Sequence, residues 1–131
     1  MVLVDDFIGT GETALGAVDY IHKLIPSFEN NQHIVILSII AMRSGIDVLE
    51  SQNIKVYTNI ICGRGISDKY TGEELVRAES IMRGIEKKIR KLDKKWEFGY
   101  KRSEALVCME RCPNNTFPIY WEMKKIAPYE R

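Results

Sequence analysis

The sequence predicts an α/β domain built on a parallel β-sheet. Three apolar segments with the composition of strands occur at residues 1–6, 33–41 and 54–62. Helical periodicity fills the two intervals between them. Because strands that alternate with helices form right-handed crossovers, this pattern favours a partial doubly wound, Rossmann-like sheet whose ligand edge lies at the carboxyl ends of the strands.

The two intervals each predict one helix. Residues 14–25 place apolar side chains at steps of three and four, and Pro26 ends this helix. Residues 33–41 are a near-continuous β-branched run, which is typical of a strand buried on both faces. Residues 43–51 predict a short helix ahead of the third strand. The apolar face of the first helix consists of Ala14, Ala17, Val18, Ile21, Leu24 and Ile25.

Residues 71–96 predict one long amphipathic helix. Thr71 followed by Glu74 forms a capping box, and the apolar residues recur every three or four positions. The stretch from Lys87 to Lys95 is strongly basic, so a nucleic-acid contact is an alternative to the favoured reading of a solvated helix face. The apolar positions are Leu75, Ala78, Met82, Ile85, Ile89, Leu92 and Trp96.

Polar residues beyond the third strand leave two interpretations open. Arg64, between two glycines, either aims its guanidinium at a pyrophosphate or is solvated. A fourth strand is predicted at residues 105–110, followed by the turn formers Asn114 and Asn115. These asparagines either contact a base or another part of a ligand, or only cap the turn, and Trp121 either stacks on a ligand or fills the core.

Composition predicts one soluble domain over residues 1–131, in the cytoplasm. The chain is 45% hydrophobic and 28% charged, with no apolar run long enough to span a membrane and no recognisable leader. A formal charge of +1 gives no global attraction to nucleic acid. The three cysteines, Cys62, Cys108 and Cys112, lack a zinc-ligand spacing, which predicts reduced thiols, two of them buried in strands. The alternative is a metal site of Cys108, Cys112 and His33.

The turn after the first strand concentrates residues suited to chemistry. The strand is expected to carry Asp5 and Asp6 to the edge of the sheet, where the next helix points its unpaired N–H groups. Two glycines let the backbone approach an anion, and two threonines add donors. The carboxylates suit sugar hydroxyls or Mg²⁺ held through water or the ligand. The alternative is an ordinary strand-turn-helix. The residues expected to bind phosphate are Ile8, Gly9, Thr10, Gly11, Glu12 and Thr13.

Residues 1–13 resemble the phosphoribosyl-pyrophosphate signature of the type I phosphoribosyltransferases. Four apolar residues, the acidic pair and Thr-Gly-x-Thr follow in the order of that signature. The resemblance implies that Asp5 and Asp6 bind the ribose 2- and 3-hydroxyls, that the loop binds the 5-phosphate, and that Mg²⁺ accompanies phosphoribosyl pyrophosphate. Phe7 is bulkier than usual, and Gly9 replaces the aspartate that serves as general base in purine-using members, so that role has no proton acceptor here.

The segment Asn-Asn-Thr-x-Pro-x-x-Trp, ending at Trp121, resembles the ending of phosphoribosyltransferase-like domains in bacterial conflict and defence loci. The resemblance covers only the second half of the family fold, because the phosphate-loop strand begins at Met1. It implies ligand binding without a complete transferase, and a homodimer or partner chain that supplies the missing half; a fragment of a longer protein is another explanation. The alternative function is a nucleic-acid or protein-interaction module that uses the basic helix 71–96.

Overall fold

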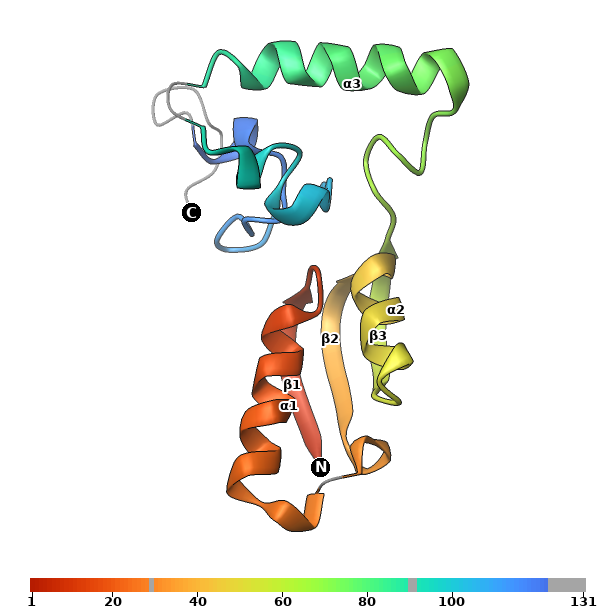
Figure 1. Cartoon of the computed structure of the whole chain (residues 1–131), viewed down its shortest axis with the longest axis vertical. Helices are drawn as coiled ribbons and strands as arrows, with labels where there is room; N and C mark the ends of the chain where they lie inside the picture. The colour runs from red at the N-terminus through yellow and green to blue at the C-terminus, as the bar shows by residue number, and fades with distance from the viewer. Residues whose placement is uncertain (29, 90–91, 123–131) are drawn as a thin grey trace. The chain divides into compact units, whose positions relative to one another are not determined.

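The computed structural model describes residues 1–28, 30–89 and 92–122. Internal contacts divide the chain into two compact units, a first unit Met1–Cys62 and a second unit Gly63–Arg131 (Figure 1). Whether the two form one domain, as the sequence predicts, stays a prediction. Within the described ranges, no helix is both long and apolar enough to cross a membrane.

The first unit is a three-stranded parallel sheet, which confirms the predicted α/β class. Strands β1 (Val2–Ile8), β2 (Val35–Met42) and β3 (Lys55–Cys62) lie side by side in the order of the sequence. Helix α1 (Glu12–Leu24) joins β1 to β2, and α2 (Arg43–Ser51) joins β2 to β3. Because both crossovers step in the same direction across the sheet, both helices cover the same face (Figure 1).

The core of the first unit lies between these helices and the covered face of the sheet. Leu3, Ile36 and Val56 are neighbours in register across the three strands and belong to this core. Burying such side chains is the main favourable term in folding a unit of this size. Two short 3₁₀ turns, η1 (Pro26–Phe28) and η2 (Asn31–His33), precede β2. The fully buried members are Ile8, Val18, Ile34, Ile36, Ala41, Ile46, Leu49 and Ile54.

The opposite face of the sheet is apolar and is not covered by either helix of the first unit. Val4, Leu37 and Tyr57 are neighbours in register on this open face and are 79%, 40% and 58% exposed. Ile39 is exposed on the same face of β2. The prediction that this strand is buried on both faces is therefore wrong. Two right-handed crossover connections that step in the same direction place both helices on one face of the sheet and leave the other face without a helix.

The second unit is organised around α3 (Gly72–Glu86). The predicted long helix begins where expected but ends at Glu86 rather than at Trp96. Thr71 precedes it in an extended conformation and makes no side-chain capping bond, so the predicted capping box does not form. A separate 3₁₀ turn, η3 (Lys94–Trp96), starts after Asp93, whose carboxylate accepts a bond from the Lys95 N–H at 3.1 Å. Residues 90 and 91 lie outside the described residues.

A tertiary contact explains why α3 stops at Glu86. The Glu86 carboxylate is buried and accepts the Phe98 N–H, with N to oxygen distances of 3.0 and 3.2 Å. In a continuous helix these residues would be about 18 Å apart, so the bond requires the chain to turn back. The turn begins with bonds from Lys88 N–H to the Ile85 carbonyl and from Ile89 N–H to the Glu86 carbonyl, which have 3₁₀ spacing.

The predicted fourth strand at residues 105–110 does not form in the described structure. Its only ladder contact is an isolated bridge between Ala105 and Thr116. The preceding residue, Glu104, has a φ of 51°, so the chain enters this segment in a left-handed rather than an extended conformation. Short 3₁₀ turns, η4 (Tyr100–Arg102) and η5 (Pro118–Tyr120), make up the rest of the regular structure.

A second buried carboxylate fixes the start of the second unit. Glu104 is 1% exposed and accepts the N–H groups of Ile66 and Ser67 at 2.9 and 2.7 Å. Its carbonyl accepts the Gly65 N–H at 2.8 Å. Since each of these N–H groups would be costly to bury without a partner, the side chain holds residues 65–67 in a single conformation.

Candidate functional site

The turn between β1 and α1 is where the sequence predicts an anion site. Gly9, Thr10 and Gly11 form the turn, and Gly11 has a φ of 82°, a left-handed conformation that glycine adopts at low cost. Gly11 occupies the N-cap position of α1, where its lack of a side chain leaves the first amides without a side-chain acceptor from the cap. The first N–H groups of a helix have no partner within the helix, so these amides are suited to an anion.

Gly45, in the first turn of α2, holds this turn in place, and sequence reasoning missed it. A Cβ atom on Gly45 would lie 2.2 Å from the Gly9 carbonyl oxygen, and a Cβ on Gly11 would lie 3.1 Å from the Gly45 carbonyl oxygen. The backbones of α2 and the turn are therefore in direct contact, and neither position leaves room for a side chain. The available signal was a glycine inside an amphipathic helix, where it costs stability unless packing requires it.

The acidic pair lies within β1 rather than at its end. β1 continues through Phe7 and Ile8, so the expectation that the strand ends at the carboxylates is wrong. Since side chains alternate along a strand, Asp5 and Asp6 project to opposite faces of the sheet. Asp5 lies on the helix-covered face and is partly buried, while Asp6 is exposed on the open face. The Asp6 N–H donates to the Asp5 carboxylate at 3.0 Å.

Asp5 occupies a polar row on the otherwise apolar covered face. Its register neighbours are Ser38 on β2 and then Thr58 on β3. The Ser38 hydroxyl is buried and has no hydrogen-bond partner among the described residues. Burial raises the pKa of Asp5, and the adjacent charge of Asp6 raises it further, whereas the Asp6 N–H opposes the shift. A carboxyl group destabilised in this way is typical of a site that binds a partner with hydroxyl donors or a cation.

The other predicted site residues belong to the second unit and have structural partners there. The Arg64 side chain is exposed, and its backbone N–H donates to Asp68 at 2.7 Å. The Asn115 amide donates to the Ser103 hydroxyl at 3.2 Å, and the Asn114 carbonyl accepts the Tyr100 N–H at 2.9 Å. These bonds favour the turn-capping interpretation of the asparagines over a base contact.

Trp121 fills the interior of the second unit instead of presenting a stacking surface. It is 6% exposed, and its indole N–H donates to the Thr116 carbonyl at 2.9 Å. The indole edge lies against Trp96, with ring centroids 5.9 Å apart. Of the two interpretations of Trp121, the structure supports the packing role.

The cysteines are free thiols in different environments. Cys62 in β3 is partly exposed, Cys108 is exposed and Cys112 is buried. The last two lie outside any strand, which corrects the expectation that two cysteines are buried in strands. Across residues 1–28, 30–89 and 92–122, no three His, Cys, Asp or Glu side chains group closely enough to hold a metal ion, and this includes the alternative set with His33.

A cavity of about 690 Å³ in the first unit lies at the wrong end of the sheet for this chemistry. It adjoins the amino end of β3, whereas the turn with Gly11 follows the carboxyl end of β1. In open parallel sheets, ligands bind beyond the carboxyl ends of the strands. We therefore place the candidate site at the turn and not at the cavity, whose lining residues are Glu50, Asn53, Ile54, Lys55, Val56 and Tyr57.

The chain matches a known protein family. The family model described as PRTase-CE matches residues 1–129, which include β1, the glycine turn and the whole described part of the second unit. No match was found among curated proteins. The match covers nearly the whole chain, so it concerns both units and not the signature at residues 1–13 alone.

Replacing Gly45 by Ala tests the contact between α2 and the turn. The added methyl group would meet the Gly9 carbonyl at 2.2 Å, so we expect a loss of roughly 1–3 kcal/mol in the free energy of unfolding. Gly16→Ala in α1 is the matched control, because nothing lies within 4 Å of its Cβ position. This control should gain about 0.5–1 kcal/mol from helix propensity. Equal stability of the two variants in denaturant titrations would contradict the contact.

Replacing Asp5 by Asn tests the burial of its carboxyl group. Because the folded pKa of Asp5 is raised, its stabilising contribution is present below the unfolded pKa and is lost as pH rises through the folded pKa. Asn resembles the protonated acid, so the variant should melt higher than the wild type at pH 7 and nearly level with it at pH 3. Asp19→Asn, at an exposed position of α1, is the control. A gain of the same size at both pH values would argue against burial as the cause.

Proposed function

Because the chain belongs to the PRTase-CE family, a phosphoribosyltransferase-type family, we propose that it binds phosphoribosyl pyrophosphate or the 5-phosphate of a nucleotide at the turn between β1 and α1. The observation that carries this proposal is the backbone of the turn. Gly11 is left-handed, Gly9 lies against Gly45, and α1 begins directly after this turn. This arrangement supports an anion at the helix terminus.

The phosphate would be bound mainly by backbone groups. The amides of Glu12 and Thr13 open α1, and the helix dipole favours a negative charge at this end. Thr13 is exposed and Thr10 is partly exposed, so both hydroxyl groups are accessible as further donors. The Glu12 side chain is exposed as well. We assign the contacts to the 5-phosphate to residues 8–13.

The ribose hydroxyls are assigned to the carboxylates of Asp5 and Asp6. A carboxylate accepts hydrogen bonds from hydroxyl groups and repels phosphate, which suits the division of roles between β1 and the turn. Asp5 and Asp6 project to opposite faces of β1, so a Mg²⁺ ion would contact them through water or through a bound pyrophosphate rather than between the two carboxylates. When bound, Mg²⁺ would neutralise charge on the pyrophosphate.

We propose binding without transferase turnover by this chain alone. Gly9 stands where a general base would be needed and offers no proton acceptor. What the turn and the carboxylates supply is positioning of the phosphorylated sugar. By its ending at residues 114–121, we place the chain with phosphoribosyltransferase-like domains of bacterial conflict and defence loci.

We also propose that a second copy or another chain pairs with the first unit. β1 has a neighbour on one side only within the described sheet, and unpaired strand edges in soluble proteins are normally covered. The open face beside it exposes Val2 and Val4, Leu37 and Tyr57. An apolar patch next to a free edge is characteristic of an interaction surface.

Two double variants test the ligand site. Thr10→Ala with Thr13→Ala, and Asp5→Asn with Asp6→Asn, should each weaken binding of ribose 5-phosphate by about 1–3 kcal/mol per lost charged hydrogen bond. The measurement is calorimetric titration of the full chain with ribose 5-phosphate, and with phosphoribosyl pyrophosphate plus Mg²⁺. Unchanged affinity in both double variants would reject the assignment.

The controls for this titration are exposed positions of the same residue types elsewhere. Asp19→Asn lies on α1 and Thr71→Ala precedes α3, and both residues are exposed. Neither is expected to change the affinity. The absence of any binding by the wild-type chain would also overturn the proposal.

Val4→Lys tests the association through the open face. Val4 is exposed on β1, so a buried lysine at an interface would cost several kcal/mol of desolvation while the monomer would tolerate it. We expect at least tenfold weaker self-association or partner binding in sedimentation and light scattering. Tyr20→Lys, at a 62% exposed position of α1, is the matched control. A wild-type chain that stays monomeric at micromolar concentration would contradict pairing with a second copy.

A further inference from the structure

The positive charge of this chain is concentrated in one segment of the second unit. Residues 87–102 contain eight Lys or Arg and two acidic residues, which gives this segment a net charge of +6. The whole chain carries +1, so the remaining residues carry −5 together. Such segregation creates a strong local field although the total charge is nearly zero. A local positive field of this kind attracts polyanions.

The described part of this segment forms a surface in which aromatic rings alternate with lysines. Trp96 and Tyr100 are in contact, with ring centroids 5.3 Å apart and planes inclined by 46°. The Lys95 ammonium lies 5.2 Å from the Trp96 ring, and the Lys101 ammonium lies 5.9 Å from the Tyr100 ring. We call Lys94, Lys95, Trp96, Tyr100 and Lys101 the aromatic–lysine surface.

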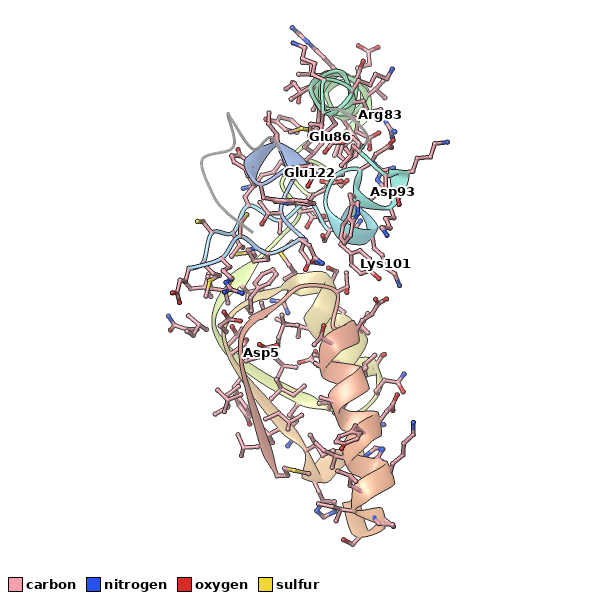
Figure 2. The ribbon with its side chains drawn as sticks, turned by 90° about the vertical axis from the view of Figure 1, so that its left-hand side faces the viewer. Asp5, Arg83, Glu86, Asp93, Lys101 and Glu122 are labelled. Carbon is pink, nitrogen blue, oxygen red and sulfur yellow. The ribbon has the colours of Figure 1, made fainter. Side chains whose placement is uncertain are left out.

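The charges of this surface remain accessible to solvent. Lys94, Lys95 and Lys101 are exposed, and both rings are partly exposed. Lys95 is 3.6 Å from Asp93, but both side chains of this pair are exposed, so the pair is weak. Asp93 and Lys101 are labelled on the same side of the second unit in Figure 2.

Neighbouring charges on the surface of the unit pair with one another. Arg102 donates to Glu79 at 2.8 Å, and its guanidinium stacks 4.8 Å from the Phe98 ring. Glu97 pairs with Arg83 at 3.5 Å, and both side chains of this pair are partly exposed.

Backbone constraints hold the two rings in place. Gly99 has a φ of 81°, and a Cβ there would lie 2.0 Å from the Asn115 carbonyl oxygen. The Phe98 N–H is bound by the buried Glu86 carboxylate, and Lys101 adopts a φ of 53°. In Figure 2, Glu86 is labelled on the lower side of α3, of which it is the last residue. A strained backbone fixed by buried contacts is a common property of binding sites, because it orders the contact groups in advance.

We infer that the aromatic–lysine surface binds single-stranded nucleic acid. Bases would stack on Trp96 and Tyr100, and the lysines would pair with successive phosphates. A single strand is favoured over a duplex because its base faces are available for stacking. This site lies in the second unit and is independent of the phosphate turn in the first.

Fluorescence provides a direct measurement of this contact. The chain has two tryptophans, and Trp121 is buried, so quenching by a bound base reports on Trp96. We expect the full-length chain to bind 15-residue oligo(dT) and oligo(U) with quenching, and to bind a duplex of the same length at least tenfold more weakly. The logarithm of the affinity should fall linearly with the logarithm of salt concentration.

Substitutions separate stacking from charge. Tyr100→Ala should weaken single-strand binding at least fivefold, since stacking on one aromatic ring accounts for about 1–3 kcal/mol per base. Lys95→Gln and Lys101→Gln should each reduce the salt slope by about 0.7. A Trp96→Ala variant would remove the other stacking ring, but it would also lose the packing of Trp96 against Trp121 and could fail to fold. The Tyr100, Lys95 and Lys101 variants test the contact without that loss. Lys23→Gln and Tyr20→Ala, both exposed on α1, are matched controls that should bind normally.

Three results would contradict the inferred binding of single-stranded nucleic acid. No quenching at low salt would overturn the inference. So would a Tyr100→Ala variant that binds as tightly as the wild type, or heparin and duplex that bind as well as the single strand, because either result indicates charge attraction without stacking. Each folded variant should retain any affinity for ribose 5-phosphate shown by the wild type, which keeps this test separate from the site on the turn.

Discussion

The contact between Gly45 and the backbone of Gly9 is the constraint on which the candidate site depends. It brings the start of α2 against the turn that opens α1, so the turn is held by a helix from the next crossover. Peptide groups can approach this closely only where no Cβ intervenes. The three glycines therefore act together. Gly9 and Gly11 form the turn, and Gly45 lets the backbone of α2 pack against it. A turn held in this way keeps its amides oriented before any ligand arrives, which lowers the cost of binding.

The order of the strands explains both the stability of the first unit and its openness. Two crossovers in the same direction put α1 and α2 on one face, where Ile36, Ile46 and Leu49 form a dry core. The same topology leaves Val4 and Leu37 on a face without helices in this unit. The acidic pair spans the two environments, because alternation along β1 buries Asp5 partly and exposes Asp6. The carboxylates proposed to bind the ligand and the apolar face proposed for pairing thus share strand β1.

The second unit derives its shape from buried carboxylates rather than from a sheet. Glu86 binds the Phe98 amide, and Glu104 binds the amides of Ile66 and Ser67. Both side chains are buried, and their partners come from other parts of the second unit, so each bond fixes a loop that has no regular structure. Burial raises the pKa of Glu86, which shows the electrostatic cost of this device. The loops so fixed present the Trp96 and Tyr100 rings together.

The sequence by itself determined the strands β1 to β3, the helices α1 and α2 and the composition of the turn, because β-branched runs, helical periodicity and glycine-threonine turns are local properties. Only the tertiary structure decided where α3 ends, that residues 105–110 form no strand, and that Gly45 supports the turn. The end of α3 and the support of the turn each depend on a contact between residues far apart in the chain, Glu86 with Phe98 and Gly45 with Gly9. Local sequence patterns do not specify which distant amide or carbonyl group a residue will contact in the folded chain. Such tertiary contacts therefore override the local preference for helix or strand.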